Sequence, residues 1–417
     1  MGVDDLRGVI ERSSIDYSAV YPTVSEILKT VRIQGDAAVR DYTKKFDNLD
    51  IGSLRVPEAE VKRAYSACGP KIIRALKKAH RNIKAIHTVQ HQGFDGDWMY
   101  DVERGVCVGE RMSPIDSVGC YVPGGRAAYP STVLMTVTPA KIAGVKRIVV
   151  VSPPKIPDIV LAACKIAGVD EIYQVGGAQA VAVLAYGTES IKRVSKIVGP
   201  GNKYVTAAKM MVYGKVDIDM PAGPSEILII ADKTANPSFI AADVLAQAEH
   251  DPNAQCVLVT DSKKIIDDVV ANIKVESRLS EKRDLLHQSL DNFTIVMVKS
   301  IKDAVEFANQ YAPEHLEIHT KNADGVQKKI KNAGAIFVGP YAPVAAGDYA
   351  SGGNHVLPTG GAARFSSQLS VRDYMKSTSI QKITKEGLKK LAPTITALAE
   401  KEGLIEHARS VEKRLNT

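Results

Sequence analysis

From Val118 onward, the sequence alternates short apolar runs with stretches of helical spacing, and this alternation constrains the fold more than any other feature. Residues 147–152 (RIVVVS) predict a buried strand, residues 158–167 a helix, residues 171–175 a strand and residues 178–186 a second helix. Strands and helices in this order are typical of a parallel sheet covered by helices. The sequence therefore predicts an α/β fold.

A second series of the same kind follows residue 226. Helical stretches separate its predicted strands, which cover residues 227–232, 256–260, 294–298, 316–319 and 335–338. A chain of 417 residues is also too long for one simple core. We therefore expect two Rossmann-like α/β units, neither of which has a standard nucleotide-binding fingerprint.

The first ninety residues have helical spacing. Thr23 and Glu26 form a capping-box pattern ahead of one helix, and a longer helix follows Gly69. The spacing changes at residues 98–108, where apolar residues alternate on either side of a turn. This segment predicts a short β-hairpin.

The C-terminal part begins with a polar, glycine-rich stretch at residues 339–370 that has little periodicity. Long structureless stretches inside compact proteins are usually functional or disordered. Helical spacing returns at Lys385, and Pro393 and Gly403 are expected to break this tail into pieces.

Charge and cysteine usage exclude several classes of protein. The net charge of +7 comes from scattered basic pairs with few aromatic residues, so no nucleic-acid partner is expected. No apolar run is long enough to cross a bilayer, and no secretory signal opens the chain, so no membrane association is expected. The five cysteines form no CxxC pair, which argues against disulfides and thiolate zinc sites and favours a cytoplasmic location.

Several short motifs carry side chains able to do chemistry. Gln247 and His250 lie three residues apart at the end of a predicted helix, where an amide oxygen and an imidazole could converge on one cation. A histidine at a helix C-terminus more often interacts only with the helix dipole and with solvent. This motif alone therefore does not establish a metal site.

Three further motifs are equally open. Glu314 and His315 follow a proline at a helix–strand boundary and could supply two bases of different strength, or form a plain surface pair. Residues 347–355 (GDYASGGNH) place Asp348 in a glycine-rich loop that permits close ligand approach, although Asp is also common in turns. Residues 402–407 (EGLIEH) read by themselves as an exposed helical tail.

Evidence for a nucleotide site is indirect. No GxGxxG motif follows a predicted strand, because Tyr204 stands where the third glycine would follow Gly199 and Gly201. Three glycine-bearing turns remain, at residues 121–125, 175–179 and 198–202. They could wrap a dinucleotide with backbone N–H groups and the amides of Gln179 and Asn202, or they could be ordinary turns between strands and helices.

Eight segments, in order along essentially the whole chain, resemble the signature segments of the histidinol dehydrogenase family. They are GCYVPGGRAAYPSTVLMTVTPAKIAGV, QVGGAQAVAVLAYGT, VGPGNKYV, DMPAGPSEILIIAD, DVLAQAEHDP, YAPEHLEI, GDYASGGNHVLPTGGAARFSS and KEGLIEHARSV. Gly353 departs from the family pattern, in which Thr or Ser is more common. The resemblance implies a zinc-dependent, NAD-linked oxidoreductase that converts L-histidinol to L-histidine through bound L-histidinal, the last step of histidine biosynthesis.

The resemblance also implies a role for particular residues. The zinc ligands would be Gln247, His250, Asp348 and His407, with His407 donated by the neighbouring subunit of a domain-swapped homodimer. The substrate would contact these four residues and Ser225, His315 and Glu402, while Tyr121, Gln179 and Asn202 would line the NAD site. We expect His315 to act as base in both hydride transfers and Glu314 to help activate the water that hydrates the aldehyde.

The expected domain organisation is discontinuous. The first α/β domain, with the zinc and catalytic residues, would combine residues 15–118 and 226–370. The second, which binds NAD, would be inserted at residues 119–225. A helical N-terminal segment (1–14) and a helical tail in contact with the partner subunit (371–417) would complete the chain.

Two alternatives remain. A cysteine-dependent, NAD-linked aldehyde dehydrogenase would need an activated thiolate such as Cys120, yet Gly119 and Tyr121 beside it supply neither a base nor a cation. We therefore expect Cys120 to be a small buried residue. A non-catalytic protein that binds a metal or an amino acid would have no use for the paired bases at residues 314–315.

Overall fold

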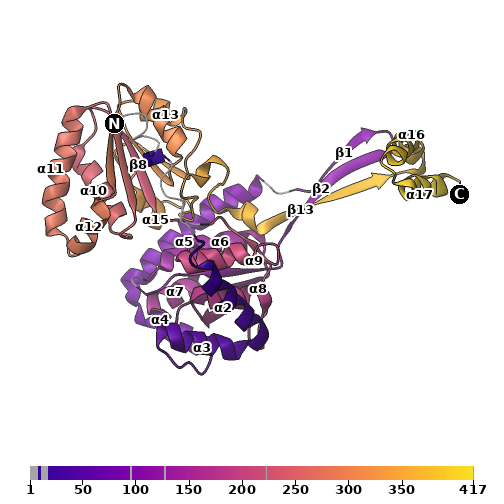
Figure 1. The fold of residues 1–417 in the computed structure, drawn as a ribbon, viewed down its shortest axis with the longest axis horizontal. Coiled ribbons are helices and arrows are strands. Elements are labelled where there is room, and N and C mark those ends of the chain that lie inside the picture. Colours follow the sequence, from indigo (N-terminus) through magenta and orange to yellow (C-terminus); the bar gives the residue numbers. More distant parts are fainter. Residues whose placement is uncertain (1–7, 11–16, 94–95, 126–127, 222, 417) are drawn as a thin grey trace.

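The computed structural model describes residues 8–10, 17–93, 96–125, 128–221 and 223–416. Within these residues the chain forms two parallel five-stranded sheets covered by helices, and an arm that projects from the body (Figure 1). The predicted α/β fold with two Rossmann-like units is confirmed. Most of the predicted N-terminal segment lies outside the described residues, but residues 8–10 are helical.

The first sheet has the strand order β5-β4-β3-β6-β7, and its neighbouring strands are parallel. The chain starts at the central strand, moves to one edge and then returns to the other, so the sheet is doubly wound, with a switch point between β3 and β6. The strands are β3 (Ser117–Tyr121), β4 (Arg147–Ser152), β5 (Glu171–Gln174), β6 (Lys196–Val198) and β7 (Asp217–Ile218). The helices between them are α6 (Pro130–Ala143), α7 (Asp158–Ala167), α8 (Gly177–Tyr186) and α9 (Lys203–Val212).

The N-terminal helices also cover the first sheet. They are α2 (Tyr21–Gln34), α3 (Asp36–Asp47), α4 (Glu58–Ala67) and α5 (Gly69–Gln92). Val24 of α2 shares a core with Val181 of α8, and Ile83 of α5 shares another with Val150 of β4. The structure therefore differs from the predicted grouping of residues 15–118 with residues 226–370, because the apolar faces of these helices are buried against residues 117–216 instead.

The start of α2 also differs from the prediction. The helix begins at Tyr21, with Val20 at the N-cap and no side-chain cap, and Thr23 lies inside its first turn. The helix begins before the expected capping box because a proline lies in its first turn. Proline is favoured at this position, since it has no N–H group to leave unsatisfied.

The second sheet repeats the same winding, with the order β10-β9-β8-β11-β12 and parallel pairing throughout. Its strands are β8 (Glu226–Ala231), β9 (Gln255–Thr260), β10 (Phe293–Met297), β11 (His315–His319) and β12 (Ala335–Val338). Its helices are α10 (Pro237–Ala248), α11 (Lys263–Leu279), α12 (Arg283–Leu290), α13 (Ile301–Tyr311), α14 (Ala323–Gln327) and α15 (Val344–Tyr349). Alternate residues of β8 are buried on opposite faces: Ile229 packs with α10, and Leu228 packs with α13.

The arm is an antiparallel three-stranded ribbon that carries two helices at its outer end (Figure 1). The predicted hairpin is confirmed as β1 (Trp98–Glu103) and β2 (Val106–Pro114). The tail from residue 371 was predicted to be helical, but it begins with the 3-10 turn η2 (Val371–Tyr374) and strand β13 (Met375–Ile383), which pairs with β2. The strand could not be recognised locally, because its pairing partner lies more than 250 residues earlier.

The rest of the tail is helical, as predicted, and forms α16 (Lys385–Lys401) and α17 (Ile405–Leu415). The predicted break at Gly403 is confirmed, since α16 ends just before it. The break predicted at Pro393 is wrong: Pro393 lies inside α16 on its exposed face, where water can bind the carbonyl that the proline leaves free. None of the described helices is long and apolar enough to cross a membrane.

Candidate active site

The second sheet gathers the strongest candidate residues at the amino ends of its central strands. Ser225 precedes β8, Glu314 precedes the neighbouring strand β11, and His315 begins that strand. Helix α10 runs back to the same edge before the chain enters β9, so Gln247 arrives there as well. This edge is opposite to the carboxyl ends, at which ligands usually bind in doubly wound sheets.

The turn before β11 places the Glu314 side chain at this edge. Helix α13 ends at Ala312, whose φ of 52° lies in the left-handed region that is unusual for a residue with a Cβ atom. Pro313 then prevents the helix from continuing, as the sequence predicted. The Glu314 carbonyl accepts a hydrogen bond from the Ala335 N–H, which fixes the start of the strand.

The Glu314 carboxyl group is buried and held by two donors. It accepts hydrogen bonds from the Ser225 hydroxyl at 2.7 Å and from the Glu226 N–H at 2.9 Å. Burial raises the pKa of Glu314 to about 8; these two hydrogen bonds oppose the rise, and the charges of Glu226 and Asp348 add to it. A carboxyl group with such a pKa can gain or lose a proton near neutral pH, as a general acid or base must.

His315 is poised as a neutral base. Its Nδ1 lies 3.0 Å from the Glu226 carbonyl oxygen. Since a carbonyl can only accept, Nδ1 carries the proton and Nε2 carries the lone pair. The Nε2 atom is buried and has no hydrogen-bond partner among the described residues. Burial lowers the pKa of His315, which favours the neutral form that a base requires.

Two of the four predicted zinc ligands are buried beside these bases. Gln247 is 2% exposed, and its side-chain nitrogen has no hydrogen-bond partner among the described residues. Asp348 is 8% exposed; burial raises its pKa, and the nearby His315 opposes this rise. Asp348 was expected in an irregular loop but lies in the short helix α15. Gly347 lets α15 approach the sheet closely, because a Cβ atom there would lie 2.8 Å from the Phe337 ring.

The third predicted ligand, His250, lies just beyond the end of α10. Its N–H donates to the Gln247 carbonyl at 3.2 Å, so the helical path continues for one further turn. The side chain is exposed at the rim, and partial burial, followed by the charge of His315, lowers its pKa. His250 and His315 are therefore close enough to interact electrostatically.

His355 belongs to the same cluster, although it was not among the predicted site residues. Its Nδ1 lies 3.8 Å from the Asp348 carboxylate. Burial, with His315 and His250 nearby, lowers the pKa of His355 to about 4, so its ring is neutral. The adjacent Asn354 fixes this segment, since its side chain donates to the Met135 carbonyl of α6 in the first unit at 2.8 Å. The sequence signal was the GGNH motif, which gave no indication that the imidazole turns toward Asp348.

The two predicted site residues in the tail do not join this cluster. Glu402 and His407 are exposed near α17, at the outer end of the arm (Figure 1). Within one chain, the structure thus brings Ser225, Gln247, His250, Glu314, His315 and Asp348 together at one edge and leaves these two apart.

The side chains at this edge fit a divalent zinc ion. An amide, an imidazole and a carboxylate are suitable donors, and three protein donors leave a further position open. Gln247 is buried with no described residue as a partner for its amide nitrogen, and Asp348 is a carboxylate kept from solvent. The Gln247 oxygen is the atom through which this amide would bind a cation.

The three predicted NAD residues lie at the opposite kind of edge, the carboxyl ends of the first sheet. Tyr121 ends β3, Gln179 lies in the first turn of α8, and Asn202 is the N-cap of α9. Tyr121 and Gln179 are buried, and the Tyr121 hydroxyl accepts a hydrogen bond from the Gly177 N–H at 3.1 Å. Asn202 is exposed, but its oxygen already caps α9. The side chains of Tyr121 and Asn202 therefore hold the turns in shape. A ligand at this edge would mainly meet the backbone of the turns.

A buried ion pair holds the Gly199 turn at this edge. Gly199 donates its N–H to Asp219 at 2.6 Å, and its carbonyl accepts from Lys209 at 2.9 Å. Lys209 and Asp219 also pair with each other, and their side chains are only 3% and 2% exposed. Gly199 has a φ of 112°, and a Cβ atom there would collide with the Tyr121 carbonyl oxygen. Lys209 and Asp219 were not singled out in the sequence, because their spacing of ten residues has no recognised pattern.

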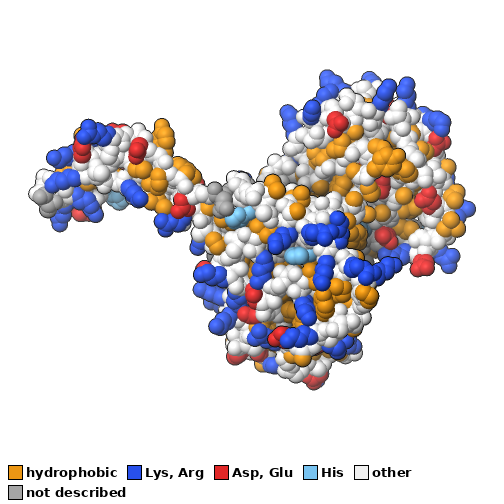
Figure 2. Space-filling view, turned by 180° about the vertical axis from the view of Figure 1, so that it is seen from behind, with side chains coloured by type: hydrophobic (Ala, Val, Ile, Leu, Met, Phe, Trp, Pro, Cys, Tyr) orange, Lys and Arg blue, Asp and Glu red, His pale blue; other side chains and the backbone are white. Residues whose placement is uncertain are grey.

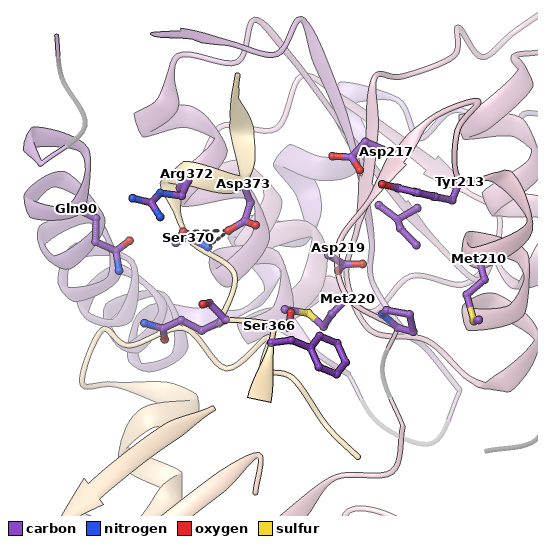
Figure 3. A pocket seen from close by; sticks show the side chains of 15 residues that line it. Gln90, Met210, Tyr213, Asp217, Asp219, Met220, Ser366, Ser370, Arg372 and Asp373 are labelled. Carbon is purple, nitrogen blue, oxygen red and sulfur yellow. Dashed lines mark hydrogen bonds between the residues drawn. The ribbon is translucent and has the colours of Figure 1, made fainter. Parts of the chain in front are cut away.

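A cavity of about 820 Å³ opens beside this ion pair, between α9, β7 and the segment that leads to β13 (Figure 3). Its lining includes Tyr213, Asp219, Phe365, Arg372 and Asp373. Among the described residues, none of the predicted metal or catalytic side chains lines it. The cavity and the titratable cluster at the second sheet are therefore separate features.

Cys120 is a buried structural residue, as predicted. It is 0% exposed, and burial raises the pKa of its thiol to about 12. A thiol with this pKa is not an activated nucleophile at neutral pH.

Two doubly wound units and a buried Glu–His pair, at the sheet edge that also holds Gln247 and Asp348, are typical of an α/β enzyme with acid–base chemistry. Comparison with known proteins identifies the particular family. The histidinol dehydrogenase family model matches residues 10–415, and the chain belongs to that family.

Individual relatives agree with this family assignment. Histidinol dehydrogenase of Methanococcus maripaludis is 49% identical, over 99% of this chain and 97% of its own. The enzyme of Methanothermobacter thermautotrophicus is 50% identical, over 98% of this chain and 96% of its own. The crystal structure of histidinol dehydrogenase from Elizabethkingia anophelis matches with a TM-score of 0.93 at 36% identity, covering 100% of this chain and 96% of that one.

Proposed function

We propose that this chain is a zinc-dependent, NAD-linked histidinol dehydrogenase that oxidises L-histidinol to L-histidine in the last step of histidine biosynthesis. The observation that carries the proposal is the buried pair Glu314–His315, which lies at one sheet edge with Gln247, His250 and Asp348. A protein that only binds its ligand would not need two buried bases with opposite pKa shifts.

Two oxidations must occur in succession. Conversion of a primary alcohol to a carboxylate removes four electrons, and NAD when bound accepts two of them as a hydride, so two NAD molecules are used in turn. A water molecule supplies the second carboxylate oxygen. In the first oxidation, His315 Nε2 takes the alcohol proton as the hydride leaves the carbon.

Glu314 then has a different task. The aldehyde stays bound, and a water molecule attacks the aldehyde carbonyl carbon. The Glu314 carboxylate removes a proton from this water. His315 returns its first proton to solvent and then accepts the hydroxyl proton of the resulting hydrate during the second hydride transfer. The difference in pKa direction supports this division of labour, since His315 is neutral and Glu314 exchanges a proton close to neutral pH.

Gln247, His250, Asp348 and the partner subunit's His407 would hold the zinc ion. When bound, the ion supplies a fixed positive centre that orients the imidazole and amine of histidinol. Ser225 and the partner subunit's Glu402 would complete the substrate pocket. His355, whose Nδ1 lies 3.8 Å from the Asp348 carboxylate, would help to orient that ligand.

The arm supports a shared site in a homodimer. All six residues of β1 are exposed, and they include Trp98, Met99 and Tyr100. Exposed apolar side chains also lie on the part of the arm nearest the body (Figure 2). Apolar surface on a projecting ribbon is expected where another chain covers it. A domain-swapped partner would bury this surface and bring His407 to the zinc site.

The carboxyl edge of the first sheet supports the proposed NAD site. The Gly199 turn follows β6 beside the switch point and leads into the N-terminus of α9, whose dipole favours an anionic group. Tyr121, Gln179 and Asn202 would shape this site.

The proposed activity is tested by incubating the purified protein with histidinol and NAD. We expect two NADH per histidinol, loss of activity on chelation and recovery with zinc. A protein that binds histidinol without forming NADH would support the non-catalytic alternative. Activity that survives chelation but is abolished by thiol alkylation would support the cysteine-dependent aldehyde dehydrogenase.

A further inference from the structure

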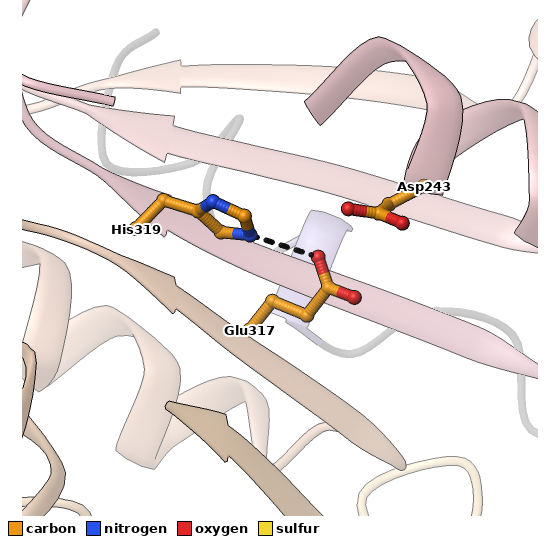
Figure 4. Close-up of side chains that lie close together, drawn as sticks. All are labelled: Asp243, Glu317 and His319. Carbon is orange, nitrogen blue, oxygen red and sulfur yellow. Dashed lines mark hydrogen bonds and ion pairs between the residues drawn. The ribbon is translucent and has the colours of Figure 1, made fainter. Parts of the chain in front are cut away.

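A largely buried polar cluster lies on α10 and β11, the elements that also carry Gln247 and His315. It consists of Asp243 on α10 and Glu317 and His319 on β11 (Figure 4). Their ligand-type atoms all lie within 4.8 Å of one another. Glu317 is 0% exposed and His319 is 4% exposed, so the cluster lies inside the second unit. The reaction proposed above uses none of these three residues.

Each member of the cluster shares an element with a proposed site residue. Asp243 precedes Gln247 by four residues on α10, which is one helical turn. Glu317 follows His315 by two residues on β11, and a spacing of two places both side chains on the same face of the strand. The alternate residues Leu316 and Ile318 are buried in the core on the other face.

Glu317 also reaches the element that carries Asp348. Its Oε1 accepts a hydrogen bond from the Val344 N–H, the first residue of α15, at 2.9 Å. Its Oε2 lies 3.2 Å from His319 Nε2. One buried carboxylate thus contacts α10, β11 and α15, the three elements that carry Gln247, His315 and Asp348.

The negative charge of the Glu317 carboxylate is compensated by three donors. Burial, and then the charge of Glu317 with which it shares a hydrogen bond, raises the pKa of Asp243 to about 8. At neutral pH Asp243 is therefore largely protonated and can donate to Glu317. The Val344 N–H and the His319 ring supply the other two donors, and a buried carboxylate needs such compensation.

We propose that Asp243, Glu317 and His319 are positioning residues that hold α10, β11 and α15 in the arrangement in which Gln247, His315 and Asp348 converge. This inference rests on the proposed zinc-dependent function. Residues that support metal ligands from behind typically change metal affinity by about 10- to 100-fold when they are replaced. The cluster reaches these ligands through the helices and the strand and does not touch the substrate.

The test uses the full-length protein and measures zinc affinity by competition with a chromophoric chelator. Glu317→Gln removes the charge and turns one acceptor into a donor, so we expect zinc affinity to fall about 10- to 100-fold and the KM for histidinol to rise. Asp243→Asn keeps a donor toward Glu317 and should retain zinc affinity within about threefold. Asp243→Ala has no donor toward Glu317 and should lose zinc affinity. Because residue 243 is only half-buried, this variant should still fold. Glu306→Gln, on the exposed face of α13, is the matched control.

The outcomes separate the inference from the proposed function. If the wild-type protein binds no zinc, both fail. If the wild type binds zinc and Asp243→Ala matches it, the inference alone is overturned. Equal damage from Asp243→Asn and Asp243→Ala would also overturn it, because that result would mean an ionised Asp243 that acts as a metal ligand itself. The visible spectrum of the cobalt-substituted protein gives an independent readout: we expect it to change in Glu317→Gln and to stay unchanged in Glu306→Gln.

Discussion

At the scale of single residues, the two neighbouring bases Glu314 and His315 differ because their hydrogen-bond partners differ. Glu314 receives two donors and still has a raised pKa, whereas His315 donates to a carbonyl and keeps a free lone pair. Glu314→Gln should therefore slow the oxidation of histidinal by about 100-fold or more and affect the oxidation of histidinol less, since only the former needs activated water. Single-turnover rates with each substrate measure this difference. Equal losses in both steps would contradict the assigned roles.

The raised pKa of Glu314 also makes stability depend on pH. Its pKa rises from 4.5 to about 8 on folding, so between these values the folded chain holds a proton that the unfolded chain has lost. The contribution of Glu314 to the free energy of unfolding is fully present below pH 4.5 and is lost as the pH rises through about 8. In metal-free protein, the free energy of unfolding should thus decline more steeply with rising pH in the wild type than in Glu314→Gln. Denaturant titrations at several pH values test this, and parallel curves for the two proteins would refute it.

Cys120 provides the residue-scale test of the rival thiol route. Because its thiol is buried with a pKa of about 12, Cys120→Ser should keep both oxidation steps at rates within a few-fold of the wild type. Steady-state rates with histidinol and with histidinal are the measurement. A variant that folds but fails in aldehyde oxidation would restore the cysteine mechanism.

The sequence predicted the position of a site residue where the reactive side chain lies next to a recognisable boundary between two elements. The Glu314–His315 pair was expected at a helix–strand boundary and lies there. The meeting of Asp348 with His355 was not predictable, because it depends on α15 packing over Phe337 and on Asn354 binding α6. Such contacts join segments that are distant in the chain and leave no local pattern.

At the scale of elements, the Gly199 turn links the first sheet to the proposed NAD site. Lys209→Met would leave Asp219 as a buried charge without its partner, which destabilises a protein by about 3–5 kcal/mol. The turn should loosen, and the KM for NAD should rise more than the KM for histidinol. Lys215→Met, at an exposed position just after α9, is the control. A folded Lys209→Met protein with an unchanged KM for NAD would remove this turn from the NAD site.

Elements with their own periodicity were predicted to within one or two residues, as α7 and β12 illustrate. Strand β13 was missed because most of its residues are exposed, so its sequence does not alternate between apolar and polar residues. The strand is defined only by its pairing with β2. The start of α2 was misplaced because the proline and the capping-box threonine, both signals for a helix start, are adjacent in the sequence. The helix begins with the proline in its first turn.

At the scale of the whole molecule, the packing of the N-terminal helices was the least predictable feature. Their apolar faces fit either sheet in principle, and only the tertiary structure shows that α2 to α5 cover the first one. The proposed zinc site then lies where the second sheet meets a segment bound to α6 of the first unit. The site is therefore expected to depend on how the two units are joined.

In the proposed enzyme, the site at the amino edge of the second sheet is completed by the partner subunit's His407. This arrangement is tested most directly with differently tagged chains that are co-expressed and purified as mixed dimers. Asp348→Ala and His407→Ala should each be inactive alone, but their mixed dimer contains one intact site and should regain about half of the wild-type activity. The matched control pairs a chain carrying both substitutions with a wild-type chain, and this dimer should be inactive. An inactive first dimer together with an active control would show that each chain supplies its own His407 and would contradict the account.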